Sequence, residues 1–260
     1  MDKIKYGFLD PESPEKSEFE EHYKFIKENN ETLFILSYRL NEFSFSLLDK
    51  LDTNQRTNNQ KLLAKCLFLR IMDYYQSCVI LSQRGMASSA KVFIRCLIEL
   101  AKSLKKTVKD PNFYIAFTLS AIQDHEDILK LYKKNNGSLP IDEIDKKLKE
   151  IKETKEELSA KIIKSTDVYQ DFEVPKTLYK YYCQSVHSTL NDLSKEYLTN
   201  DKYINYGPNH SEIPDIVSLS INLILNAMEN IDNLFELKID EKIKSFYEEL
   251  NLIAINQGNL

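Results

Sequence analysis

Residues 59–109 decide the fold class, and they read NQKLLAKCLFLRIMDYYQSCVILSQRGMASSAKVFIRCLIELAKSLKKTVK. Two strongly apolar stretches, residues 59–83 and 86–109, are joined by Arg84-Gly85. A glycine at the end of such a stretch is typical of a helix C-terminal cap. The second stretch ends at Asp110-Pro111, because proline cannot continue a helix. The segment therefore predicts two long apolar helices and an all-α protein.

The composition of the 260-residue chain favours a helical protein over a β-protein or a disordered chain. Its 5 glycines and 7 prolines are too few for an all-β fold, which needs a turn signal about every 8 to 12 residues. A hydrophobic content of 42% is enough to build a core. We therefore predict an all-α fold.

Six further helices are expected on the two sides of this pair. Their approximate bounds are 17–50, 112–135, 140–164, 175–198, 215–237 and 240–255. We predict a single bundle of about eight helices over residues 17–260. A flexible N-terminal arm is expected over residues 1–16, where prolines lie among charged residues.

Residues 111–165 predict a helical hairpin, with Asn136-Gly137 at its turn. Apolar residues in the second helix alternate spacings of four and three, as along a coiled-coil seam, and they are Ile144, Leu148, Ile151, Leu158 and Ile162. Lys155 occupies the one seam position that is not apolar. We expect the hairpin either to project from the body or to lie flat on the core.

The net charge of −5 provides no overall attraction to nucleic acid or to an anionic membrane. Binding to either would need a local basic patch. Arginine, which forms bidentate contacts to phosphate, is confined to the first third of the chain, at Arg39, Arg56, Arg70, Arg84 and Arg95. No apolar stretch predicts a signal peptide or a membrane span. We therefore expect a cytoplasmic protein with no membrane partner.

No motif in the sequence predicts a metal or cofactor site. The cysteines lie far apart and are expected to be reduced, mostly buried thiols: Cys66, Cys78, Cys96 and Cys183. A ferritin-like di-iron site needs Glu-x-x-His, which does not occur, and His125 lacks the adjacent His-Asp pair of metal phosphohydrolases. Glycine-rich phosphate loops are also missing. We expect neither a metal nor a cofactor.

Four mostly apolar helices each carry a narrow line of polar side chains along one face. Along residues 86–109 the line is Ser88, Lys91, Arg95, Glu99 and Lys102; along 59–83 it is Arg70, Asp73 and Ser77; along 215–237 it is Ser218, Asn222, Asn226, Glu229 and Asn233; along 175–198 it is Lys180, Gln184, His187, Asn191 and Lys195. If the lines face one another, they form a polar cleft between helices. Alternatively, each line is the solvent face of its own helix, with Arg95 and Glu99 as an intrahelical ion pair.

Two stretches carry a resemblance to known proteins, and they are Val92-Phe93-Ile94-Arg95-Cys96-Leu97-Ile98-Glu99 and Tyr179-x-x-Tyr182-x-x-Ser185-x-His187-Ser188. Over roughly residues 60–235 the chain resembles a family of bacterial helical proteins known as a domain of unknown function. The pattern is also similar to the HEPN superfamily. That superfamily consists of helical-bundle proteins that frequently dimerise and include metal-independent ribonucleases of toxin–antitoxin and phage-defence systems.

The HEPN resemblance implies that His187 acts as a general acid or base on RNA. Lys180 stands where the HEPN nuclease motif begins with arginine. Arg95 would therefore have to supply the planar guanidinium that binds a phosphate through two hydrogen bonds. Further residues that would bind RNA or orient the catalytic groups are Glu99, Tyr182, Ser185, Arg70, Asn222 and Asn226. The resemblance thus predicts an RNA-binding or RNA-cleaving effector that forms a homodimer and has an antitoxin protein as a partner.

The competing hypothesis is a non-enzymatic interaction protein whose hairpin recruits a protein partner. The polar lines would then only solvate helices or pair internally. The acidic balance of charge and the missing arginine favour this class, whereas the resemblance favours the RNA-directed effector.

Overall fold

The computed structural model describes residues 7–9, 16–51, 59–135, 140–160, 180–183, 193 and 206–256. Its elements are a short 3-10 helix η1 (Gly7–Leu9) and the α-helices α1 (Glu20–Asn29), α2 (Glu31–Leu48), α3 (Asn59–Gln83), α4 (Ala87–Lys109), α5 (Phe113–Lys134), α6 (Ile141–Ser159), α9 (Ile213–Phe235) and α10 (Asp240–Asn256). No strand occurs in these ranges. The all-α helical bundle is therefore confirmed.

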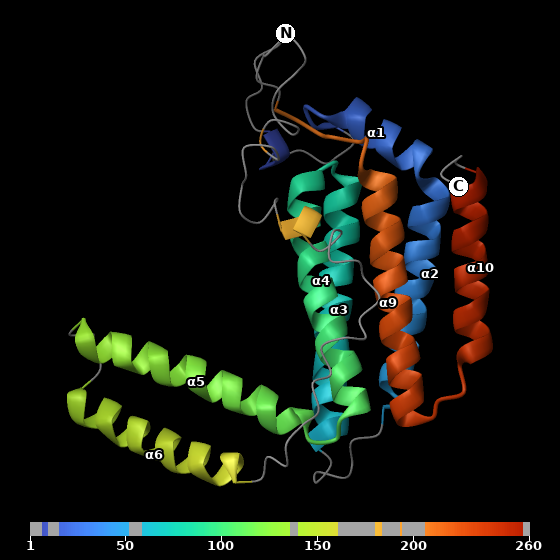
Figure 1. Cartoon of the computed structure of the whole chain (residues 1–260). Helices are drawn as coiled ribbons and strands as arrows, with labels where there is room; N and C mark the ends of the chain where they lie inside the picture. The colour runs from blue at the N-terminus through green and yellow to red at the C-terminus, as the bar shows by residue number, and fades with distance from the viewer. Residues whose placement is uncertain are drawn as a thin grey trace.

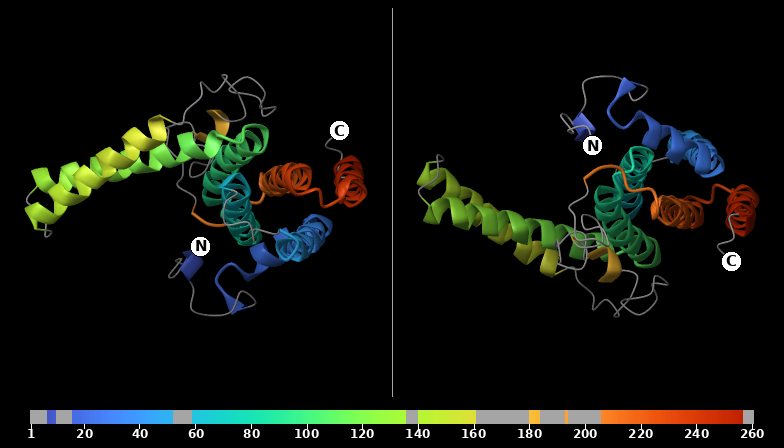
Figure 2. Two further views of the ribbon diagram at one scale, coloured as in Figure 1. Left: turned by 90° about the horizontal axis from the view of Figure 1, so that it is seen from below. Right: turned by 90° about the horizontal axis from the view of Figure 1, so that it is seen from above.

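The centre of the bundle is formed by α3, α4 and α9, each of which packs against the other two. Figure 1 shows these three helices standing side by side with α2 and α10, and Figure 2 shows the same helices along their axes. Both α2 and α10 pack against α9. One continuous cluster of buried apolar side chains joins the five helices, with members such as Leu36, Phe68, Ile94, Ile224 and Phe246.

The turn between α3 and α4 depends on Gly85, as the sequence predicted. Its φ of +68° is a left-handed conformation that favours glycine. The backbone N–H of Met86 donates to the carbonyl of Leu81 at 3.0 Å, which is the long hydrogen bond of a Schellman cap. A Cβ on Gly85 would lie 2.6 Å from the Cβ of Pro208. The loop that leads into α9 therefore approaches this turn as closely as only glycine permits.

The single helix predicted over residues 17–50 is wrong, because the structure divides it into α1 and α2 at Asn30 (φ −125°, ψ 18°). The side-chain amides of Asn29 and Asn30 donate to the carbonyls of Phe25 and Ile26 at 2.8 and 2.9 Å. Such side-chain bonds to backbone groups compete with regular helix geometry. The apolar periodicity continues on both sides of the break, so it did not reveal the division.

Further expectations from the sequence concern the cysteines and two segments of the chain. All four cysteines are free, but the expectation that they are mostly buried is wrong. Cys78 is buried, Cys96 and Cys183 are half-buried, and Cys66 is exposed because it lies on the face of α3 turned away from the core. The predicted helix over residues 175–198 and the predicted arm over residues 1–16 lie largely outside the described residues, although residues 180–183 are helical.

Across the described part of the chain, no helix has both the length and the apolar character needed to cross a membrane.

Candidate functional site

A buried polar junction lies where the start of α4, residues 180–183 and the start of α9 meet. It consists of Lys91, Tyr181 and Glu212. The Lys91 Nζ lies 2.5 Å from the Glu212 Oε2, and the Tyr181 hydroxyl donates to the Glu212 Oε1, also at 2.5 Å. The carboxylate of Glu212 therefore accepts from two donors that come from two different parts of the chain.

The ion pair in the polar junction is largely removed from solvent. Only 4% of the Lys91 side chain and 27% of the Glu212 side chain are exposed. A lysine this deeply buried needs a carboxylate partner, because an unpaired ammonium loses its hydration without compensation. The junction therefore joins α4 to α9 electrostatically.

The local sequence before α9 places Glu212 at this point. The Asn209 Oδ1 accepts from the backbone N–H and the hydroxyl of Ser211, at 3.1 and 2.9 Å, which closes the turn ahead of the helix. Pro214 then lies in the first turn of α9, where its missing N–H costs no hydrogen bond. Glu212 is thereby held as the N-cap residue, next to the positive end of the helix dipole.

Two tyrosines anchor residues 180–183 on the bundle. The ring of Tyr181 lies 5.7 Å from the Lys91 Nζ and 5.2 Å from the ring of Tyr182. Tyr182 belongs to the main core, and burial raises its pKa, with further contributions from Asp215, Cys78 and Glu212. Tyr182 is therefore a neutral core residue. Its buried ring fixes the segment by packing on the core. The sequence hypothesis gave Tyr182 a different task, which was to orient His187 or the RNA.

The remaining sequence-predicted site residues are distributed over several helices. Arg95 pairs with Glu99 at 3.1 Å within α4, and exposed Arg70 lies 3.8 Å from Asp73 within α3. In α9, the amide of Asn222 donates to the carbonyl of Ser218 at 3.0 Å, and the amide of Asn226 lies 3.5 Å from Glu229. Each of these contacts lies within one helix.

The proposed catalytic segment is described only at its beginning. Lys180 is exposed at the start of residues 180–183, whereas Ser185 and His187 lie outside the described residues. Because Tyr181 reaches Lys91, the described part of this segment lies beside the polar line of α4. In the described ranges, no group of three or more His, Cys, Asp or Glu side chains is placed to hold a metal ion.

Sequence reasoning placed Lys91 on a polar line but did not identify Glu212 or Tyr181 as its partners. One signal was available. Lys91 is the one charged residue among the first eight of α4, and a lysine in such an apolar run requires a carboxylate. Glu212 precedes an Ile-Pro helix start. Pattern alone could not choose Glu212 among 40 acidic residues.

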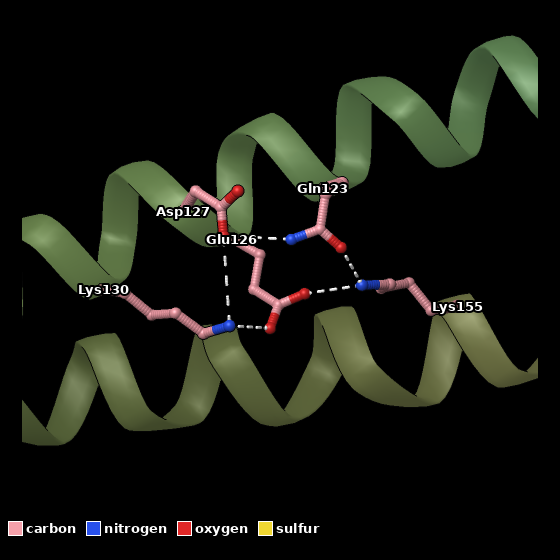
Figure 3. A network of polar contacts seen from close by, with 5 residues as sticks. All are labelled: Gln123, Glu126, Asp127, Lys130 and Lys155. Atoms are coloured by element: carbon pink, nitrogen blue, oxygen red, sulfur yellow. Dashed lines mark hydrogen bonds and ion pairs between the residues drawn. The ribbon is translucent and has the colours of Figure 1, made fainter.

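The α5–α6 hairpin is a second candidate surface, and it has its own small core of Leu129, Ile144 and Ile151. Lys155, the one non-apolar residue of the predicted seam, bonds across to α5 (Figure 3). Its Nζ lies 2.5 Å from the Gln123 Oε1 and 2.7 Å from the Glu126 Oε2, while Glu126 also pairs with Lys130. The lysine therefore replaces an apolar contact by a charged contact between the two helices.

The hairpin projects from the bundle, which settles the alternative left open by the sequence. Figure 1 and Figure 2 both show α5 and α6 extending away from the other helices. α5 packs against α3 and α4 as well as against α6. Farther along the hairpin, exposed apolar side chains include Ile128, Leu131, Tyr132 and Ile141. This projecting surface is available to a partner.

Substitution of the polar junction should reveal coupling between α4 and α9. Lys91→Met leaves the Glu212 carboxylate without its cation, and Glu212→Gln leaves the buried ammonium without its anion. Each is expected to lower the free energy of unfolding by about 2–3 kcal/mol. The free energy of unfolding, measured by chemical denaturation, should fall clearly less in the double variant than the sum of the two single losses. Lys180→Met, at an exposed position, serves as the control. Additive losses would contradict the coupling.

The hairpin should lose protection in acid. Hydrogen bonds from Lys130 and then Lys155 lower the pKa of Glu126 from 4.5 to about 2. A carboxyl group whose pKa is lowered by folding stabilises the folded state at pH values above its ordinary pKa of 4.5. This stabilisation is lost as the pH falls from 4.5 through about 2. Amide-exchange protection factors in α5 and α6 should fall across that window. Glu126→Gln should remove this pH dependence, whereas Glu150→Gln should keep it; equal behaviour of the two variants would exclude the Glu126 network as its cause.

Comparison with known proteins places these elements in a family. A family model described as "Family of unknown function (DUF5677)" matches residues 61–205, a range that includes α4, the hairpin and the segment of Lys180 and His187. No curated protein matches the chain, and no solved structure matches it. The resemblance to an all-helical family of unknown function is thereby confirmed, and the chain belongs to the DUF5677 family.

Proposed function

We propose that this protein is a HEPN-like RNA-binding effector that contacts phosphates through a cationic face of α4. The face is defined by Arg95, Lys102, Lys105, Lys106 and Lys109. The observation that carries the proposal is the charge of α4, which has six lysine or arginine side chains and one carboxylate. This helix concentrates positive charge in a chain whose net charge is −5.

The cations of α4 also share one side of the helix. At about 100° of rotation per residue, all six fall within roughly one third of the helix circumference. Lys91 is the buried member and is paired with Glu212. The other five extend the line from Arg95 to the C-terminal end of α4. A row of cations along one helix can follow a phosphate backbone and release its counterions.

The proposed catalytic role remains with His187, aided by Lys180. The described segment that begins at Lys180 is anchored against Lys91, at the N-terminal end of the same polar line. This arrangement supports a site in which α4 holds the phosphate and His187 transfers a proton between the ribose 2′-hydroxyl and the leaving oxygen. Arg95 is the one arginine of α4 and the candidate for a bidentate phosphate contact.

RNA binding should depend on α4 and not on charge in general. Arg95→Gln with Lys102→Gln is expected to weaken binding of a fluorescent single-stranded RNA by at least about tenfold. It should also reduce the slope of log K against log salt by about 1.4, as for two lost phosphate contacts. The matched control is Lys149→Gln with Lys152→Gln on α6, which removes the same charge. Equal losses in both pairs, or no binding by the unaltered protein, would overturn the proposal.

Cleavage is tested separately by incubating the purified protein with total RNA and with tRNA in the absence of metal. Cleavage by the unaltered protein that is lost in His187→Ala, at equal folded concentration, is the expected result. Binding without cleavage in both proteins would leave RNA binding as the function and would remove the catalytic role of His187.

A second candidate function rests on the hairpin. In this proposal, the protein is a non-enzymatic scaffold that binds a protein partner along the exposed side of α5. Ile128 and Leu131 have 51% and 58% of their surface exposed, whereas Ile151 of the predicted seam is buried inside the hairpin. We therefore propose that the partner contacts the outer face of α5 and not the seam.

The scaffold proposal predicts that Ile128→Lys with Leu131→Lys abolishes binding of a co-purifying protein without altering the far-UV circular dichroism spectrum. Leu252→Lys, an equally exposed substitution on α10, is the control. Titration of the purified partner against each variant would measure the loss. Unchanged affinity of the hairpin variant would refute this function and leave the RNA proposal untouched.

A further inference from the structure

A groove lies between α2 and α10, on the side of the bundle opposite the hairpin (Figure 1). Its volume is about 300 Å³, which is at the lower end of the range of small-molecule pockets. On each helix the lining residues are three or four positions apart and therefore share one face. We call this cavity the α2–α10 groove, and it is lined by Arg39, Glu42, Phe43, Ser46, Lys242 and Phe246.

The floor of the α2–α10 groove is aromatic, and an ion pair closes one end. The ring centroids of Phe43 and Phe246 lie 5.7 Å apart. At the closed end, the Arg39 Nη1 lies 2.5 Å from the Glu249 Oε1. The Arg39 guanidinium carbon also lies 5.8 Å from the centroid of the Phe246 ring. Arg39 is therefore neutralised by Glu249 and forms a wall of the groove.

Two opposite charges in the α2–α10 groove are not paired with each other. The Lys242 Nζ lies 4.9 Å from the centroid of the Phe246 ring. Among the described residues, neither Lys242 nor Glu42 forms an ion pair, although both line the groove. Both residues are exposed. The Lys242 ammonium can therefore donate to an incoming carboxylate, and the Glu42 carboxylate can accept from an incoming ammonium.

We propose that the α2–α10 groove binds a free α-amino acid with an apolar side chain. Lys242 binds the carboxylate of the ligand, and Glu42 binds its ammonium group. The apolar side chain lies on the rings of Phe43 and Phe246, where it loses contact with water. Each charge of the ligand thereby meets an opposite charge of the protein, and its apolar part meets the aromatic floor.

The presence of both charges in one small groove selects a zwitterion over ligands of a single charge. A simple anion is repelled by Glu42, and a simple cation is repelled by Lys242, because each brings like charges together. An internal residue of a peptide carries neither an ammonium nor an α-carboxylate, and a terminal residue carries only one of them. A free amino acid carries both on neighbouring atoms.

The α2–α10 groove is separate from the surfaces that carry the proposed functions. It shares no residue with the cationic face of α4 or with the outer face of α5. All of its lining residues also lie outside residues 61–205, the range that the family model matches. Amino-acid binding here therefore stands or fails independently of RNA binding and of protein recruitment.

An NMR titration of the isotope-labelled full chain with leucine tests the site first. Leucine should bind with a dissociation constant of about 1 mM or lower, and the largest amide shifts should lie at groove residues such as Phe43 and Phe246. Leucinamide, which lacks the carboxylate, and N-acetylleucine, which lacks the ammonium, should each bind at least about tenfold more weakly. Failure of leucine to bind saturably, or equal binding of either single-charge analogue, would overturn the proposal.

Substitution of each charge assigns the two contacts. Lys242→Met should weaken leucine binding at least about tenfold and make leucine and leucinamide bind equally. Glu42→Gln should likewise make leucine and N-acetylleucine bind equally. The matched controls are Lys244→Met and Glu248→Gln, which remove an exposed ion pair of α10 and should leave leucine affinity unchanged. Equal losses in groove and control variants, or discrimination between the ligands that survives both groove substitutions, would refute the assignment.

Discussion

The close approach of Gly85 and the loop before α9 is the constraint on which the rest of the bundle depends. The backbone N–H of Asn209 donates to the carbonyl of Gly85 at 2.9 Å, and Pro208 fills the space that a side chain at Gly85 would occupy. This contact brings the start of α9 to the start of α4. Glu212 can therefore reach Lys91, and the core between α3, α4 and α9 closes from that end.

Charged residues inside helix seams recur in this protein. Lys91 lies between α4 and α9, and Lys155 lies between α5 and α6, each bound to a carboxylate of the facing element. Buried or half-buried pairs of this kind add little net stability compared with apolar contacts, but they favour one register over its alternatives.

The two surfaces proposed for function belong to different helices, and this separates the hypotheses experimentally. α4 offers positive charge, whereas the outer face of α5 offers exposed apolar side chains at a distance from the body. A helical bundle by itself specifies no chemistry, so the fold does not decide between RNA binding and protein recruitment. Substitutions on one surface leave the other intact.

The sequence by itself determined most of the helices among the described residues, the cap at Gly85 and the hairpin seam with Lys155, because all of these depend on residues close together along the chain. The break at Asn30 was missed, since two asparagine side chains override a periodicity that continues on both sides. Only the tertiary structure decided that Lys91 is buried while Arg70 is exposed, although both lie on similar polar lines. The reason is that burial of a helix face depends on which distant segment packs against it, and neither spacing nor composition identifies that segment.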